Sequence, residues 1–274
     1  MEKPFKSTLW KRIGGIFRWN RTSYLLMSGF IALILLIIYI WWPLVVEYFA
    51  TYDSAIPFWK QLDWLLIGIF LFMSFLIMAN ANIKADFPIV FIGFMGGLVI
   101  ESWGTQTHLW NYFTFERPPL WIIPAWPIAS LSIDRLFRLI NLLVKKIPEN
   151  RFVWVYWTIF TAFYAYMLSF VWVTIDKSLT VMSLVLCAFL ILTPTNYRAT
   201  VITFLAGSGL GYFLELWGTT RLCWTYYTFQ QPPFFAVLAH GMAAVSFLRV
   251  YWLFHTFKPH LASFLLRKRD FTSS

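Results

Sequence analysis

Long apolar segments alternate along the chain with short polar or basic ones. A helix needs about 20 residues to cross the roughly 30 Å hydrocarbon core of a bilayer, and apolar runs near that length recur along the sequence. The predicted membrane-spanning helices cover residues 24–49, 62–82, 86–104, 120–142, 152–175, 178–195, 197–217 and 233–256. The pattern therefore predicts an all-α, polytopic membrane protein with about eight transmembrane helices.

Composition supports this class. The 274 residues are 59% hydrophobic and 12% charged, with a mean hydropathy of +0.66. One soluble core does not need so much apolar surface.

The fourth predicted span is the least regular, because prolines crowd its start and Asp134, Arg135 and Arg138 lie in its second half. Proline at a helix start costs little, since the first amides have no intrahelical partner.

The distribution of basic residues predicts the orientation. With a cytoplasmic N-terminus and eight spans, 18 of the 22 Lys and Arg residues fall on the cytoplasmic side, and only Lys60, Arg117, Lys177 and Arg221 fall outside. Such a bias is typical of cytoplasmic loops, so we expect both termini in the cytoplasm. The net charge of +10 then sets orientation and favours contact with membrane lipids. A nucleic-acid partner is not expected.

Two stretches of the sequence resemble each other. ESWGTQTHLWNYFTFERPP at 101–119 and ELWGTTRLCWTYYTFQQPP at 215–233 are 114 positions apart and share ten of 19 residues. The same offset relates Gly93 and Gly97 to Gly207 and Gly211, glycine pairs that we expect to let helices pack closely. An even number of spans separates equivalent points, so we predict two tandem four-helix repeats of parallel orientation.

These boundaries predict four regions of the chain. They are a basic cytoplasmic N-terminal segment (1–23), a first four-helix repeat (24–146), a second four-helix repeat (147–257) and a basic cytoplasmic tail (258–274).

Each copy of the motif begins with a carboxylate at the outer end of a predicted span. A charged side chain costs about 2.5–3.5 kcal/mol at mid-bilayer, so Glu101 and Glu215 are expected to face protein or water. Because they lie at equivalent depth, one in each half, we predict that they face one shared cavity. The structural alternative places each Glu at the headgroup level, paired with Arg117 or Arg221.

The motif also supplies candidate substrate-binding side chains at matched positions. They are Trp103, Thr105, Trp110 and Tyr112 in the first copy, Trp217, Thr219, Trp224 and Tyr226 in the second, and His108, which has no histidine counterpart. Trp and Tyr also gather at membrane interfaces, but an aromatic belt does not require matched spacing. Aromatic faces stabilise desolvated cations by about 0.5–2 kcal/mol each.

Glu101, Glu215 and His240 are the candidate catalytic residues. A protonated glutamic acid among aromatic rings can protonate an alkene, and the rings can shelter the resulting carbocation. His240 takes the place that Trp126 has in the first half, where it is a candidate proton partner. The structural alternative is that His240 is a packed core residue.

The spacing Glu101-x-x-Gly104-Thr105-x-Thr107, followed by Tyr112 and a return through Pro124, resembles a known signature. It is similar to that of the integral-membrane carotenoid biosynthesis proteins that include the bisanhydrobacterioruberin hydratases. The resemblance implies a bacterial or archaeal plasma-membrane enzyme that hydrates or cyclises a lipid-soluble polyene or terpenoid. It implies no redox cofactor.

Two other functions fit the same sequence features. The paired acids suit a transporter or binding protein for a cation or an amphiphile. The external aromatic loops suit an accessory subunit that docks a partner. The four histidines and two cysteines lack metal-ligand spacing, so no metal site or cofactor is expected.

Overall fold

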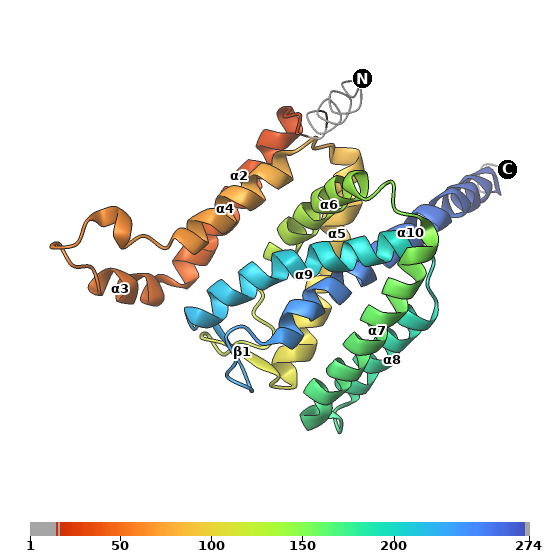
Figure 1. Ribbon diagram of the computed structural model, residues 1–274. Helices are drawn as coiled ribbons and strands as arrows, with labels where there is room; N and C mark the ends of the chain where they lie inside the picture. Colours follow the sequence, from red (N-terminus) through yellow and green to blue (C-terminus); the bar gives the residue numbers. More distant parts are fainter. Residues whose placement is uncertain (1–14, 16, 272–274) are drawn as a thin grey trace, which may run out of the picture.

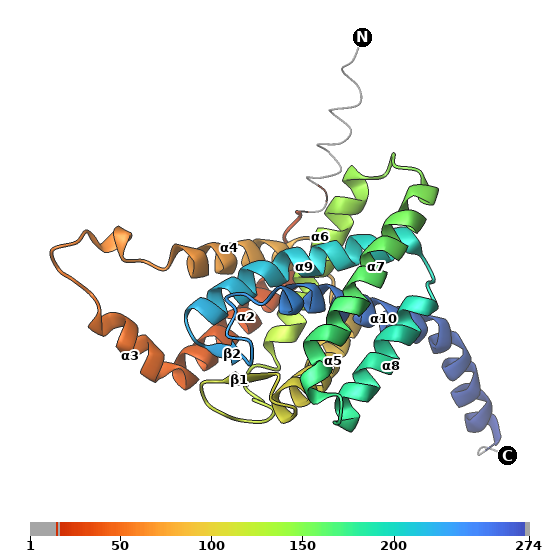
Figure 2. The same cartoon turned by 60° about the horizontal axis from the view of Figure 1, so that its bottom comes forward.

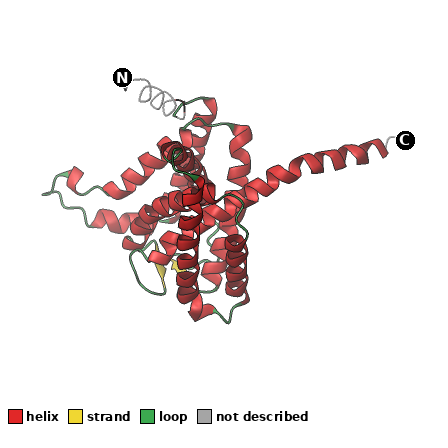
Figure 3. Cartoon of the chain, turned by 45° about the vertical axis from the view of Figure 1, so that its right-hand side comes forward, coloured by secondary structure: helices red, strands yellow, loops and turns green. Residues whose placement is uncertain are grey.

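The computed structural model describes Gly15 and residues 17–271, with side chains described as far as Thr256. Most of the predicted N-terminal segment (1–23) lies outside the described residues, as do the side chains of the predicted tail (258–274). Helices account for nearly all of the regular structure, and among the described residues the only strands are two short ones (Figure 3). The predicted all-α class is therefore confirmed.

A helix occupies each of the eight predicted apolar segments. The helices are α2 (Arg21–Ile40), α3 (Trp42–Ala50), α4 (Trp64–Met78), α5 (Ile83–Gln106), α6 (Ala125–Leu143), α7 (Glu149–Val171), α8 (Ser178–Leu192), α9 (Tyr197–Thr220) and α10 (Phe234–Phe271). Short 3₁₀ turns cover Phe58–Lys60 and Trp172–Thr174, and the strands are β1 (Trp110–Tyr112) and β2 (Trp224–Tyr226).

Five helical segments are long and apolar enough to cross a membrane. They are Arg21–Ile40, Ile83–Gln106, Glu149–Thr174, Tyr197–Thr220 and Phe234–Thr256. Helices α4 and α8 are also apolar but have 15 residues each, and α6 contains three charged residues. The fold is that of a multi-pass membrane protein, and the number of crossings stays a prediction.

The first predicted span is not one continuous helix. Helix α2 ends at Ile40, and α3 begins after Trp41, which has a φ of −90° and a ψ of 15°. Pro43 in the first turn of α3 cannot donate a backbone hydrogen bond to the preceding turn, which explains the break. As a result α3 turns away from α2 and projects from the body of the molecule (Figure 1).

Four helices form the centre of the fold. Helix α9 packs against α10, α5 packs against α6, and the two pairs meet through α6 with α9 and α5 with α10. The α2–α4 hairpin flanks this centre on one side, where α4 contacts α6 and α9. The α7–α8 hairpin flanks the other side, where α7 contacts α9 and α8 contacts α5 (Figures 1 and 2).

Close contact between α9 and α10 depends on glycines, which have no side chain, as the glycine pairs in the sequence predicted. A Cβ atom at Gly207 would lie 2.8 Å from the carbonyl oxygen of His240, and one at Gly241 would lie 2.6 Å from that of Phe204. Backbone therefore meets backbone at this crossing, and any larger residue would separate the helices.

A buried ion-pair network joins α6 to α5 and to the turn before α5. Arg135 on α6 is 1% exposed and donates hydrogen bonds to Asp86 on α5 (2.7 Å), to Asp134 (2.6 Å) and to the carbonyl oxygen of Ala79 (3.0 Å). Asp86 also accepts a hydrogen bond from the backbone N–H of Asn82. One guanidinium thus joins α6 to the turn between α4 and α5.

We predict that Arg135→Met destabilises the protein by about 3–5 kcal/mol, because it leaves the Asp86 carboxylate buried without its partner. Arg249, 114 positions later, is half-buried and contacts only Thr193 among the hydrogen bonds of the described residues. Arg249→Met is therefore the matched control and should cost far less. Unfolding in detergent measures both effects, and equal losses would contradict the assigned role of the Arg135 network.

Candidate functional site

Two buried carboxylates lie on one cavity. Glu101, near the end of α5, and Glu215, near the end of α9, are each 3% exposed. Both line a single cavity of about 860 Å³. The arginine-paired alternative is wrong, because Arg117 contacts His108 and Arg221 pairs with Asp63.

Three side chains donate hydrogen bonds to Glu101. The Trp110 indole N–H lies 3.0 Å from Oε2, and the Tyr112 hydroxyl lies 2.9 Å from Oε1. The Trp126 indole N–H, from α6, lies 3.1 Å from Oε1. Both oxygens of this carboxylate are therefore held by aromatic side chains, with no basic residue among these partners.

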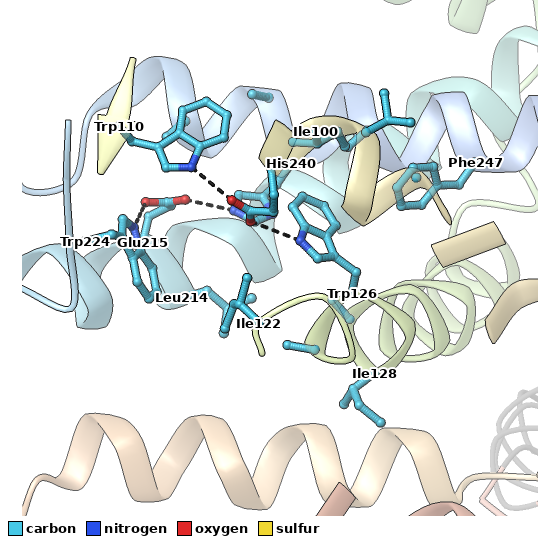
Figure 4. Close-up of a pocket in the computed structure, with 18 of the residues that line it drawn as sticks. Ile100, Trp110, Ile122, Trp126, Ile128, Leu214, Glu215, Trp224, His240 and Phe247 are labelled. Atoms are coloured by element: carbon cyan, nitrogen blue, oxygen red, sulfur yellow. Dashed lines mark hydrogen bonds and ion pairs between the residues drawn. The ribbon is translucent and has the colours of Figure 1, made fainter. Parts of the chain in front are cut away.

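Glu215 has a nearly identical set of partners. The Trp224 indole N–H lies 2.8 Å from Oε2, and the Tyr226 hydroxyl lies 2.9 Å from Oε1. The third partner differs, because Nε2 of His240 on α10 lies 2.9 Å from Oε1 (Figure 4). The rings of Trp126 and His240 stack with their centroids 5.6 Å apart and an interplanar angle of 20°.

The ends of α5 and α9 turn the chain back toward the carboxylates. After α5, His108 takes a left-handed backbone conformation with φ 61°, and the Leu109 N–H donates to the Gly104 carbonyl at 2.9 Å. This is the Schellman arrangement, in which the second residue beyond the helix caps its last turn. Helix α9 ends in the same way, with Leu222 at φ 55°.

The two returning segments pair as antiparallel strands (Figure 2). Trp110 lies opposite Tyr226, and Tyr112 lies opposite Trp224, with ring centroids 5.7 and 5.8 Å apart. Successive side chains of a strand point to opposite faces, so these four aromatic residues share one face. That face covers both glutamates, and the strand pairing fixes one half of the site relative to the other.

Glycine creates the space for each indole. Gly104 lies three residues after Glu101, on the same face of α5, and a Cβ there would lie 1.8 Å from Cη2 of Trp110. A Cβ at Gly218 would lie 2.0 Å from Cη2 of Trp224. The spacing Glu-x-x-Gly therefore lets an indole lie on the helix and reach the carboxylate one turn earlier.

Three predicted substrate-binding residues do not line the cavity. The hydroxyls of Thr105 and Thr219 donate to the backbone carbonyls of Glu101 and Glu215 at 2.5 and 2.6 Å. Threonine four residues after a carbonyl commonly bonds back to it. His108 is exposed, and its Nε2 lies 2.8 Å from Nη1 of Arg117.

The remaining predicted rings do line the cavity. The Trp103 N–H donates to the Thr180 hydroxyl at 3.3 Å, and the Trp217 N–H donates to Asp63 at 2.9 Å. Trp217 also stacks on Trp41, with centroids 5.6 Å apart. Sequence reasoning missed Trp41, because it lies inside a long apolar run without any polar neighbour to single it out.

Asp63 links the N-terminal end of α4 to Trp217 and Arg221 at the C-terminal end of α9. Partial burial opposes its ionisation, but hydrogen bonds from Arg221, from the Leu66 N–H and from Trp217 together lower the pKa of the Asp63 carboxyl. Asp63 thus remains a carboxylate that caps α4 and holds Trp217 in place.

The two strand tyrosines and Cys223 stay neutral. Burial, followed by the nearby glutamates, raises the pKa of the Tyr112 and Tyr226 hydroxyls well above the usual value. Both phenols therefore remain hydrogen-bond donors at physiological pH. Burial also raises the pKa of the Cys223 thiol to about 12, so it is not a nucleophile at neutral pH.

Within the part of the chain whose side chains are described, no three His, Cys, Asp or Glu residues group together as metal ligands. Comparison of the chain with known protein families, with curated proteins and with solved structures gave no match. The geometry of the site therefore carries the functional argument.

We predict that Gly104→Ala displaces the Trp110 indole and breaks its bond to Glu101, at a cost of about 1–3 kcal/mol. Gly209→Ala, on α9, is the control, because a Cβ at Gly209 meets nothing within 4 Å. Thermal unfolding and tryptophan fluorescence measure the two effects. If Gly104→Ala left both signals unchanged, the glycine would not be what seats the indole.

Proposed function

We propose that the protein is a membrane enzyme that hydrates or cyclises a lipid-soluble polyene or terpenoid by acid–base catalysis. One observation carries the proposal: two buried carboxylates, each with three side-chain hydrogen-bond partners, face a single cavity lined mainly by apolar residues. Apolar pockets with a few convergent polar groups are typical binding sites. The resemblance to carotenoid hydratases supports the same substrate class.

The two carboxylates differ in which protonation state their partners suit. An indole N–H can only donate, so Trp110 and Trp126 suit the ionised form of Glu101. Imidazole can donate or accept, so His240 suits both forms of Glu215. We therefore assign Glu215 as the acid, with His240 as its proton partner, and Glu101 as the base.

In this mechanism Glu215 transfers its proton to one carbon of a substrate double bond, and the other carbon becomes a cation. The faces of the surrounding indoles stabilise that cation. In hydration, water adds to the cation and Glu101 takes the proton that the water loses. In cyclisation, a second double bond attacks the cation, and Glu101 removes a proton from the product cation. Glu101 then gives its proton to water, and His240 takes a proton from water and passes it to Glu215, which restores the starting state.

We further propose that the chain crosses the membrane eight times as two parallel repeats, with both termini in the cytoplasm. The antiparallel register supports the repeat. Trp110 and Trp224 are equivalent positions, 114 residues apart, and so are Tyr112 and Tyr226. Each tryptophan pairs with the tyrosine of the other strand. Only a two-fold relation between the strands exchanges the two pairs in this way. The basic-residue bias supports the orientation.

We predict that Glu101→Gln and Glu215→Gln each reduce turnover by about 10²–10⁴-fold, because each removes a proton-transfer group. Conversion of a linear polyene such as lycopene, measured in membranes by mass, reports the loss. Glu116→Gln is the control, since Glu116 is exposed and its counterpart in the second half is Gln230. Full conversion by both site variants would refute the proposal. Solute flux that needs both glutamates, without chemical change, would assign transport instead.

The acid assignment makes a separate prediction. His240→Trp should lower kcat by about 10²-fold and increase the solvent deuterium isotope effect, because proton return to Glu215 becomes limiting. Gly211 faces His240 as Gly97 faces Trp126, so the second half has similar room for an indole. Trp126→His is the reciprocal exchange and should lower kcat less, because Glu215 keeps its proton partner. Equal effects of both exchanges would contradict divided roles.

A further inference from the structure

The cavity extends well beyond the glutamates, on both sides of the central helices. On one side it reaches the α2–α4 hairpin, where the lining residues include Phe30, Leu33, Ile34, Phe70 and Met73. On the other side it reaches the α7–α8 hairpin, where they include Phe163, Met167, Ser183, Leu186 and Cys187. We call these extensions the α4 arm and the α8 arm. Glu101 and Glu215, on α5 and α9, lie between them.

Residues at the same relative position line both arms. Met73 in the α4 arm and Cys187 in the α8 arm are 114 positions apart, as are Ile69 and Ser183. Each arm is therefore lined by a different half of the chain, through residues at equivalent sequence positions. A compact ligand held at the carboxylates would leave both arms empty.

Both arms are apolar. Among the described residues that line the cavity, the only charged side chains are the two glutamates. A lipid with a charged headgroup would find no partner at either end, and burying an unpaired charge is strongly unfavourable. The volume of about 860 Å³ lies toward the upper end of the roughly 300–1,000 Å³ usual for ligand sites. These features favour a long ligand that is apolar at both ends.

The cavity also opens to the apolar exterior of the molecule. Phe91, Met95 and Val99 lie four residues apart on one face of α5 and line the cavity, yet they are 56%, 45% and 63% exposed. A molecule dissolved in the hydrocarbon of the bilayer could therefore reach the site without passing through water.

We propose that the substrate is a linear apolar molecule that lies across the site, with an interior segment at the glutamates and one end in each arm. This inference rests on the proposed function for the role of the glutamates, and it adds the shape of the substrate and its placement. An end-on mode, in which the chain terminus sits at the glutamates and only one arm is filled, is the competing arrangement.

Filling each arm with a large side chain tests the placement. Met73→Trp blocks the α4 arm and Cys187→Trp blocks the α8 arm, both in a Glu215→Gln background so that binding is measured without turnover. Leu71→Trp and Met182→Trp are the matched controls, because these residues lie on the same two helices, are exposed and do not line the cavity. Lycopene, a linear C40 polyene, is the probe, and quenching of tryptophan fluorescence reports its binding.

We expect each arm variant to weaken lycopene binding by about tenfold or more, and the controls to bind normally. A C20 polyene hydrocarbon of half the length should tolerate either single block and lose binding only when both arms are filled. A loss confined to one arm would establish the end-on mode and overturn the proposal, and so would normal binding by both variants.

A variant that does not fold is replaced by the smaller Met73→Phe or Cys187→Phe, for which the same losses are expected. The two proposals fail separately. Full turnover by the glutamate variants would remove the catalytic function and leave the arm result intact, whereas loss in one arm alone would leave the glutamate chemistry intact.

Discussion

Pairing of β1 with β2 is the interaction on which the site depends. Each strand carries one tryptophan and one tyrosine to the carboxylate of its own half, and the ladder fixes the halves relative to each other. Hydrogen bonds to a charged group are worth about 1.5–3 kcal/mol each. A buried carboxylate that lost these donors would cost several kcal/mol, so the side chains of the strands stabilise the glutamates inside the protein.

A single exchange distinguishes the two halves chemically. Trp126 and His240 are 114 positions apart, stack on each other and contact the equivalent oxygen of their glutamates. One can only donate a hydrogen bond, whereas the other can also carry a proton. In the proposed mechanism this difference gives the two glutamates separate roles in proton transfer, and the apolar lining of the cavity suits the proposed lipid-soluble substrate.

Much of the fold follows from the sequence, because long apolar runs leave few alternatives to helices. Matched spacing also predicted that Glu101 and Glu215 would share a cavity, because they begin two similar stretches of the sequence, and both do line one cavity. The break at Trp41 was not predicted from the sequence, because a run of apolar residues does not show where one helix ends and the next begins. Pro43, two residues later, is the local signal for the break.

The sequence did not show which way each side chain of the motif points, so some predicted site residues do not reach the cavity. Thr105 and Thr219 belong to the motif, but each hydroxyl bonds to its own helix and serves the backbone. His108 lies at a left-handed position that turns it away from the cavity toward Arg117. The role of Trp126 follows only from the spatial register of α6 with α5, which a linear pattern does not contain.

Cysteine cross-linking across the strands tests the central pairing most directly. In a chain with Cys187 and Cys223 changed to alanine, Asn111→Cys combined with Thr225→Cys should form a disulfide readily, because directly opposed residues have Cα atoms about 5.5 Å apart or less. Asn111→Cys combined with Tyr227→Cys, two positions out of register, should not. Equal cross-linking of both pairs, or of neither, would contradict the paired-strand site.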